Sequence, residues 1–129
     1  MITLKTVMRL NAASCIIFAL TFLLKPTETA VFLGPETPAP EIVLLALGLG
    51  LLANGLHLLW ASSTPLPSKA MVLYFSAGDF IWVLASLSLV GLGVWITAAS
   101  GIAAALIVAM MVATLGVLQM TKRKQMGNC

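Results

Sequence analysis

Four polar side chains lie inside long apolar stretches of the sequence, where burial is costly unless protein or water satisfies them. They are Asn11, Asn54, His57 and Asp79. An acidic side chain is rare in such surroundings, so Asp79 is the leading candidate for chemistry. Beside a histidine its carboxyl group can exchange a proton or hold a polar ligand, whereas the alternative is a hydrogen bond that only fixes helix packing. Both interpretations stay open for Asp79, and helix packing is favoured for His57, Asn54 and Asn11.

The spacing of these residues predicts which of them meet. A short polar turn at residues 62–68 separates two apolar stretches, so we expect antiparallel helices on either side of it. Counted outward from the centre of this turn, Asn54 and Asp79 lie at equal depth. His57 lies one helical turn nearer to it, about 4.5 Å from the level of Asp79. We therefore expect Asp79 to hydrogen-bond to Asn54, to His57 or to both.

Small and polar residues at steps of three or four predict the faces that the helices turn inward. In the second apolar stretch they are Ala46, Gly50, Ala53, Asn54, His57 and Ala61, and in the third Ser76, Asp79, Ser86 and Gly93. In the fourth they are Gly101, Ala105, Ala109 and Ala113, and in the first Asn11, Ser14 and Thr21. The candidate polar site consists of Asp79, His57, Asn54, Asn11 and Ser76.

The composition does not favour other chemistry. Cys15 and Cys129 have no metal-ligand spacing, and the single histidine cannot supply a pair of haem ligands. No Ser-His-Asp arrangement, pair of catalytic carboxylates or phosphate-binding loop can be assembled. We expect no metal and no cofactor, and an enzyme is the less favoured class.

The elements that must position these residues are membrane-spanning helices. Of the 129 residues, 60% are hydrophobic and 9% are charged, and the mean hydropathy is +1.08. A soluble domain of this size cannot hide so much apolar surface. A helix crosses a bilayer with about 20 apolar residues, whereas barrel strands would alternate apolar and polar residues. We predict one all-α domain, a transmembrane four-helix bundle, with spans at about residues 7–24, 42–61, 70–96 and 102–120.

The connections refine this layout. The first span is expected to be retained rather than cleaved as a signal peptide. Residues 25–41 hold four of the six prolines, which prevent one continuous helix there, and residues 30–33 are apolar enough to lie on the membrane surface. The third span has two possible ends, residues 91–93 and residues 97–101. The second of these is the better turn.

The basic residues predict the orientation. Six of the seven Lys and Arg residues flank the spans on one side, and Lys25 alone lies on the other. Since Lys and Arg accumulate in cytoplasmic loops, we predict a multi-pass membrane protein with both termini cytoplasmic, that is, N-in/C-in. The basic residues form no stripe interleaved with aromatic residues. Membrane lipids are therefore expected partners and nucleic acid is not.

A second indication comes from the segment around the first connection. Leu24-Lys25-Pro26, followed by Ala30-Val31-Phe32-Leu33-Gly34 and a glycine-rich second helix, resembles the layout of small four-helix inner-membrane proteins of the DoxX-like kind. The resemblance covers about a quarter of the chain. It implies an architecture and a location in the bacterial inner membrane, and it carries over no mechanism.

Three classes of function agree with these features. The first is a noncatalytic accessory or assembly subunit, or a homo-oligomer, that packs through its small-residue seams. The second is a small proton-linked transporter or ligand-binding protein that uses Asp79, His57 and Asn54. The third is a membrane enzyme acting on a lipid or quinone, with His57 and Asp79 as acid and base. A homo-oligomer or a larger membrane complex is expected in the first class.

Overall fold

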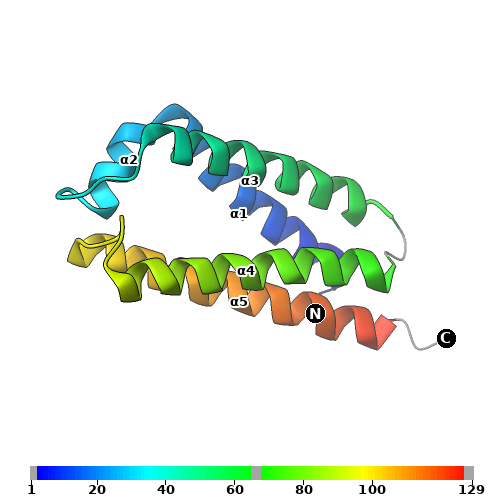
Figure 1. The fold of residues 1–129 in the computed structure, drawn as a ribbon. Coiled ribbons are helices and arrows are strands. Elements are labelled where there is room, and N and C mark those ends of the chain that lie inside the picture. Colours follow the sequence, from blue (N-terminus) through cyan, green and yellow to red (C-terminus); the bar gives the residue numbers. More distant parts are fainter. Residues whose placement is uncertain (1–2, 65–67, 127–129) are drawn as a thin grey trace.

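Helices account for most of the chain in the computed structural model, which describes residues 3–64 and 68–126. They are α1 (Leu4–Leu24), α2 (Pro26–Leu33), α3 (Glu41–Ser62), α4 (Lys69–Leu92) and α5 (Ala99–Met126). The described residues contain no strand, and α1, α3, α4 and α5 are long and apolar enough to cross a membrane (Figure 1). The prediction of an all-α chain with four potential membrane-spanning helices is confirmed. The centre of the predicted turn, residues 65–67, and Cys129 lie outside the described residues.

The long connection after α1 contains a short helix. Proline lacks an N–H group and suits the first turn of a helix, so Pro26 ends α1 and begins α2. The helix α2 is eight residues long and ends at Gly34, before the remaining prolines. As expected, the prolines prevent a continuous helix, but residues 26–33 are helical rather than irregular.

The helix α4 ends at Leu92, four residues before the predicted end of the third span. Gly93 takes up a left-handed conformation with φ of 67°, which costs a glycine little. The N–H groups of Gly93 and Val94 donate to the carbonyl oxygens of Val90 and Leu89 at 3.2 and 3.0 Å, the pattern of a Schellman motif. The glycine pattern at residues 91–93 was therefore the true end signal, and the choice of residues 97–101 was wrong.

The four long helices form two pairs rather than an evenly packed bundle. One pair consists of α1 and α3 and the other of α4 and α5, and α1 also contacts α5 (Figure 1). The helices α3 and α4 follow each other in the chain, yet they have few contacts. The expectation that the second and third spans pack together around a polar site is therefore wrong.

Glycines explain the first pairing. A Cβ atom at Gly55 would lie 2.8 Å from Cγ1 of Ile16, and one at Gly48 would lie 2.8 Å from Cγ of Leu23. Only glycine allows α1 to come this close, and the seven-residue spacing keeps both glycines on one face of α3. In contrast, the predicted inward residues Ala46, Gly50 and Ala53 are exposed. The stripe predicted for the second span is thus divided, because these three residues face outward whereas Ala61 is buried and Asn54 is half-buried.

The predicted inward faces of the other helices agree better with the structure. Ser76 and Asp79 of α4 are buried, and so are Gly101 and Ala109 of α5. Asn11 of α1 is buried as well. These three faces meet around the centre of the molecule.

The end of the molecule at α2 is closed by backbone hydrogen bonds. The carbonyl oxygen of Leu33 accepts from the N–H groups of Thr97 and Ala98 at 2.9 and 3.1 Å. A Cβ atom at Gly101 would lie 2.6 Å from that same oxygen, so the start of α5 approaches α2 closely. This contact joins the two helix pairs at the end that lies away from the termini (Figure 1).

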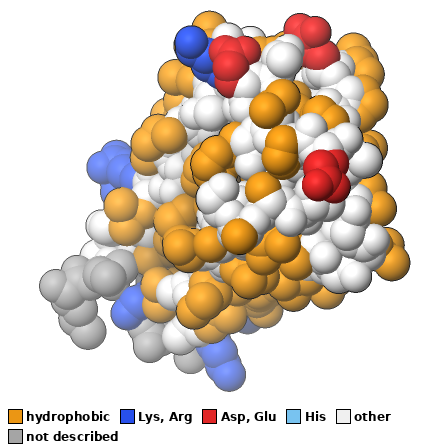
Figure 2. All heavy atoms as spheres, turned by 90° about the vertical axis from the view of Figure 1, so that its left-hand side faces the viewer, with side chains coloured by type: hydrophobic (Ala, Val, Ile, Leu, Met, Phe, Trp, Pro, Cys, Tyr) orange, Lys and Arg blue, Asp and Glu red, His pale blue; other side chains and the backbone are white. Residues whose placement is uncertain are grey.

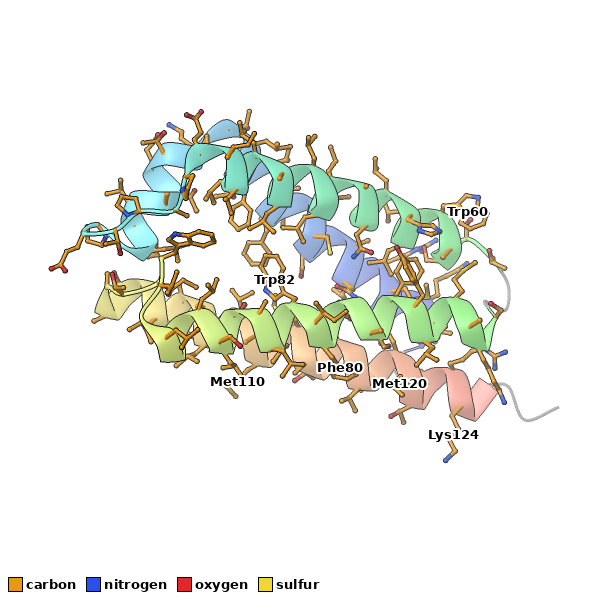
Figure 3. All side chains as sticks on the ribbon, viewed as in Figure 1. Trp60, Phe80, Trp82, Met110, Met120 and Lys124 are labelled. Atoms are coloured by element: carbon orange, nitrogen blue, oxygen red, sulfur yellow. The ribbon has the colours of Figure 1, made fainter. Side chains whose placement is uncertain are left out.

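Charged side chains on the surface lie mainly at the two ends of the molecule. Figure 2 looks onto the α2 end and shows acidic side chains spread over a largely apolar face; Glu28, Glu36 and Glu41 belong to this end. Large apolar side chains cover the flanks, among them Met110, which is 73% exposed and points away from the helices in Figure 3. An apolar flank between two charged ends is what a bilayer requires of a spanning protein.

Candidate functional site

A cluster of buried polar side chains joins α1, α4 and α5. Its members, the polar cluster, are Asn11, Ser76, Asp79 and Gln119. Asp79 is 5% exposed and the other three are at most 1% exposed. Each must find its hydrogen-bond partners within the protein, because burial removes them from water.

The carboxyl group of Asp79 is held by two amides. Nδ2 of Asn11 lies 2.9 Å from Oδ2 and 3.2 Å from Oδ1 of Asp79. Nε2 of Gln119 donates to Oδ2 at 2.9 Å, and Nδ2 of Asn11 also donates to Oε1 of Gln119 at 3.1 Å. The three side chains thus form a closed ring across three helices. Among the described residues, no Lys, Arg or His side chain hydrogen-bonds to this carboxyl group.

Ser76 completes the cluster on the side of α5. Its hydroxyl group donates to the carbonyl oxygen of Gly116 at 3.0 Å, and Nε2 of Gln119 lies 3.4 Å from its Oγ. A Cβ atom at Gly116 would lie 3.3 Å from Cβ of Asp79, so this glycine keeps α5 close to α4. The close approach brings Ser76 within reach of a backbone oxygen.

Asn54 lies near the polar cluster without joining it. Its Nδ2 donates to Sγ of Cys15 at 3.4 Å, and no hydrogen bond links it to Asp79. However, Asn54, Asn11 and Asp79 line one small cavity of about 160 Å³. We call it the polar cavity. Asn54 and Asp79 therefore line the same cavity, as residues at equal depth can do. The hydrogen bond predicted between them is absent.

His57 is not part of the site. Its side chain is exposed and packs among aromatic rings, with ring centroids 5.0 Å from Phe75, 5.9 Å from Tyr74 and 5.7 Å from Trp60. The helices α3 and α4 diverge from the turn toward α2 (Figure 1), and these ring contacts join them near the turn. The predicted pairing of His57 with Asp79 is thus corrected to an aromatic contact near the turn.

Gln119 was missed by the sequence analysis although a signal was present. A polar amide inside the fourth apolar stretch is itself a signal, because such a group needs a partner in the protein or in water. Side chains of a helix also lean toward its N-terminus, which brings the Gln119 amide back toward Gly116. Cys15 carried no such signal, because a cysteine inside an apolar helix usually behaves as a small apolar residue.

A larger, mostly apolar cavity lies beside the polar cavity. It has a volume of about 490 Å³, within the range of about 300–1,000 Å³ that small-molecule sites occupy. We call it the apolar cavity. Its walls come from α1 and α2 on one side and from α4 and α5 on the other, with Phe18, Phe32, Trp82, Ile96, Ala105 and Val108 among the lining residues.

The two cavities adjoin. Phe18 and Trp82 line both of them, and Trp82 points into the space between the helix pairs in Figure 3. Three polar side chains, Lys25, Glu28 and Thr29, line the apolar cavity near α2. Nζ of Lys25 and Oε2 of Glu28 are 3.7 Å apart, and both side chains are largely exposed, so they form a rim of no net charge. The combined space has a charged rim, an apolar middle and a polar end at Asp79.

This arrangement ties three helices together and leaves part of Asp79 facing the polar cavity. The described residues contain no group of three or more His, Cys, Asp or Glu side chains that could hold a metal ion. The amides of the polar cluster bind one another and Asp79, so their main effect is to hold α1, α4 and α5 together. The part of Asp79 that faces the polar cavity can accept or donate a hydrogen bond to a ligand.

No family model, curated protein sequence or solved structure matches the chain.

Proposed function

We propose that the chain is a noncatalytic, multi-pass membrane protein that holds one lipid-like amphiphile between its two helix pairs. The apolar cavity of about 490 Å³ carries this proposal. It lies between helices that are long and apolar enough to span a bilayer, so its contents come from the membrane. Its apolar walls favour an apolar body, and the adjoining polar cavity offers Asp79 and Asn54 to a polar group.

The rim supports a ligand whose polar end has no net charge. Lys25 and Glu28 lie within ion-pair distance, so a strongly anionic or cationic head group would meet a like charge. A single-chain lipid with an uncharged or zwitterionic head meets neither penalty. At the opposite end of the ligand, the polar cavity of about 160 Å³ favours a compact group such as a hydroxyl or carbonyl.

The orientation that we propose is N-in/C-in in a bacterial inner membrane. Lys69, Arg123 and Lys124 lie at the end of the bundle that also holds both termini, and Lys25 lies at the α2 end (Figure 1). The positive-inside rule supports a cytoplasmic location for the first end. The apolar cavity then belongs to the outer half of the membrane.

Filling the apolar cavity tests the ligand. Ala105 lines it, so Ala105→Phe would occupy the space with an aromatic ring. The matched control is Ala103→Phe, because Ala103 is exposed and lines no cavity described above. Each protein is purified into native-lipid particles, and the small molecules that remain bound are extracted and identified by mass spectrometry.

We expect the wild-type protein and Ala103→Phe to retain the same amphiphile in stoichiometric amount and Ala105→Phe to lose most of it. The helix content of each variant, measured by circular dichroism, shows that the fold is intact. If the wild-type protein retains no molecule beyond bulk lipid, or if Ala105→Phe retains as much as the control, the cavity is not a ligand site.

A second candidate is an accessory subunit or homo-oligomer with the DoxX-like layout described above. It is favoured by the exposed stripe Ala46, Gly50 and Ala53 on α3, where a Cβ atom at Gly50 would meet nothing within 4 Å. Small-residue stripes allow close packing of a second membrane helix. Gly50→Leu should then reduce cross-linked dimers, whereas the control Gly91→Leu, at an equally open glycine on α4, should not. Equal cross-linking in both variants would reject α3 as the interface.

The membrane-enzyme alternative loses its main support. It required His57 beside Asp79 as an acid and base pair, and His57 packs against aromatic rings instead. A proton-linked transporter would have to use Asp79 without that histidine. The apolar cavity, with walls from both helix pairs, favours ligand holding over either alternative.

A further inference from the structure

A basic groove lies at the end of the bundle opposite α2. It is formed where α4 begins and α5 approaches its end, and its volume is about 380 Å³. Three basic residues, Lys69, Arg123 and Lys124, line it together with three apolar ones, Val72, Leu73 and Met120. We call it the basic groove. It shares no lining residue with the apolar or the polar cavity.

No acidic side chain of the chain lies in this groove. The sequence has four Asp and Glu residues, and none of them lines it. Three belong to α2, the connection after it and the start of α3, at the far end of the molecule (Figure 2). The fourth, Asp79, is buried and hydrogen-bonded to amides. Among the described residues, Lys69 and Lys124 thus give the groove a basic lining that suits an anion.

The groove also straddles the border between apolar and polar surface. Leu73 and Met120 line it and are 58% and 43% exposed, so they offer apolar surface beside the cations. Trp60 and Tyr74, each 61% exposed, lie near the same end, and such rings favour the membrane interface. A small soluble anion would use the cations and leave this apolar surface unused. A phospholipid uses both.

We propose that the basic groove binds an anionic phospholipid, with the phosphate between Lys69 and Lys124 and the upper acyl chains against Leu73 and Met120. Basic pockets between membrane helices at the cytoplasmic side recognise such head groups in this way. The bound lipid joins the start of α4 to the end of α5. It would hold that helix pair together at the end where Lys69 and Lys124 carry like charges that otherwise repel.

Neighbouring lysines on α5 give a sharp test. Lys124 lines the groove and Lys122 does not, since residues two apart in a helix point about 200° around the axis from each other. Lys124→Gln and Lys122→Gln therefore remove the same charge from the same turn of α5. The full chain is purified in detergent and titrated with phosphatidylglycerol or phosphatidylcholine of identical acyl chains, and bound lipid is counted by native mass spectrometry.

We expect the wild-type protein to bind phosphatidylglycerol in preference to phosphatidylcholine. Lys124→Gln and Lys69→Gln should each weaken binding of phosphatidylglycerol about fivefold, the usual contribution of one basic residue near a membrane surface. Lys122→Gln should retain at least half of the wild-type affinity. The charge reversal Lys124→Glu should abolish the preference, and its helix content, measured by circular dichroism, should equal that of Lys122→Glu.

Three outcomes would overturn the proposal. Equal losses in Lys122→Gln and Lys124→Gln would indicate a diffuse surface attraction without a site. Equal binding of the two phospholipids by the wild-type protein would remove the role of charge. Displacement of phosphatidylglycerol by inorganic phosphate, but not by chloride at the same ionic strength, would identify a soluble anion as the occupant.

Discussion

Asp79 acts as a junction of three helices. Both of its carboxyl oxygens accept hydrogen bonds from amides, and those amides also bind each other. Interhelical hydrogen bonds in membranes are individually weak, about 0.6 kcal/mol on average. The cost of breaking this ring comes instead from the donors left behind, because Asn11 and Gln119 are at most 1% exposed.

This difference separates two substitutions of Asp79. Asp79→Leu would leave the amides of Asn11 and Gln119 without their acceptor, so we expect it to lower the free energy of unfolding by about 2 kcal/mol. Asp79→Asn keeps one oxygen, and the Gln119 amide can rotate to accept from the new N–H group, so we expect a loss of about 1 kcal/mol or less. Unfolding by heat in detergent, followed by circular dichroism, measures both.

Ser88→Ala on the same helix serves as the control, because the Ser88 hydroxyl group donates only to the carbonyl oxygen of Leu84 in its own helix. It should unfold like the wild-type protein. A variant Asp79→Leu that is as stable as Ser88→Ala would show that the ring contributes nothing to stability.

The sequence identified the importance of Asp79 and the burial of Asn11 and Ser76, but not the partners. Depth along a helix can be counted from a turn, and this placed Asn54 and Asp79 on one cavity. Depth alone does not say which neighbour a side chain faces. His57 has the polarity of a site residue, yet its exposed ring packs beside three aromatic rings and away from Asp79.

At the level of the helices, glycines decide which faces meet. The α3 helix carries two small-residue faces, one with Gly48 and Gly55 and the other with Ala46, Gly50 and Ala53. Both have spacings that allow close packing, so the sequence did not distinguish them. The structure turns the first toward α1 and leaves the second exposed. The sequence did contain the correct end of α4, because Gly93 fits the left-handed position that closes a helix.

Alanine at each kind of glycine separates the two faces of α3. At Gly55 a Cβ atom would lie 2.8 Å from Cγ1 of Ile16 and 3.1 Å from the carbonyl oxygen of Ala12, and backbone cannot yield easily. We expect Gly55→Ala to lower the free energy of unfolding by about 1–3 kcal/mol, the usual cost of overpacking. Gly50→Ala meets nothing within 4 Å, so we expect it to raise the free energy of unfolding by up to about 1 kcal/mol, the advantage of alanine over glycine inside a helix.

The same unfolding experiment, run in a detergent that keeps the chain monomeric, compares these two variants directly. Because both replace a glycine of one helix by alanine, differences in helix propensity cancel. Equal stabilities would mean that α1 and α3 are not closely packed at Gly55.

At the scale of the whole molecule, two helix pairs are joined at two places. The polar cluster joins α1 to α4 and α5 near the centre, and the Leu33 carbonyl oxygen joins α2 to the segment before α5 at one end. Between these joints the pairs enclose the apolar cavity. Hydrophobicity predicted the four spanning helices, but the cavity depends on which helices pair, and apolar residues alone do not encode that.

The charge division between the ends leads to a prediction about topology. The ligand cavity and the basic groove belong to opposite ends, so their assignment to the two membrane surfaces depends on the orientation of the chain. Six of the seven Lys and Arg residues lie on the side of the termini by sequence, which favours that side as cytoplasmic. In a Cys129→Ser background, we expect Glu36→Cys to react with a membrane-impermeant maleimide in intact cells. We expect Lys124→Cys to react only after the cells are lysed.

The parent background measures the reaction of the remaining thiol, which belongs to Cys15 and is 6% exposed, so it should stay nearly unlabelled. Labelling of Lys124→Cys in intact cells, with protection of Glu36→Cys, would reverse the orientation. The apolar cavity would then open toward the cytoplasmic half of the membrane, and the basic groove would face a surface where the membrane potential does not favour basic residues. A reversed result would therefore count against the anionic phospholipid of the cytoplasmic leaflet as the occupant of the groove, while leaving the two helix pairs and the cavity between them unchanged.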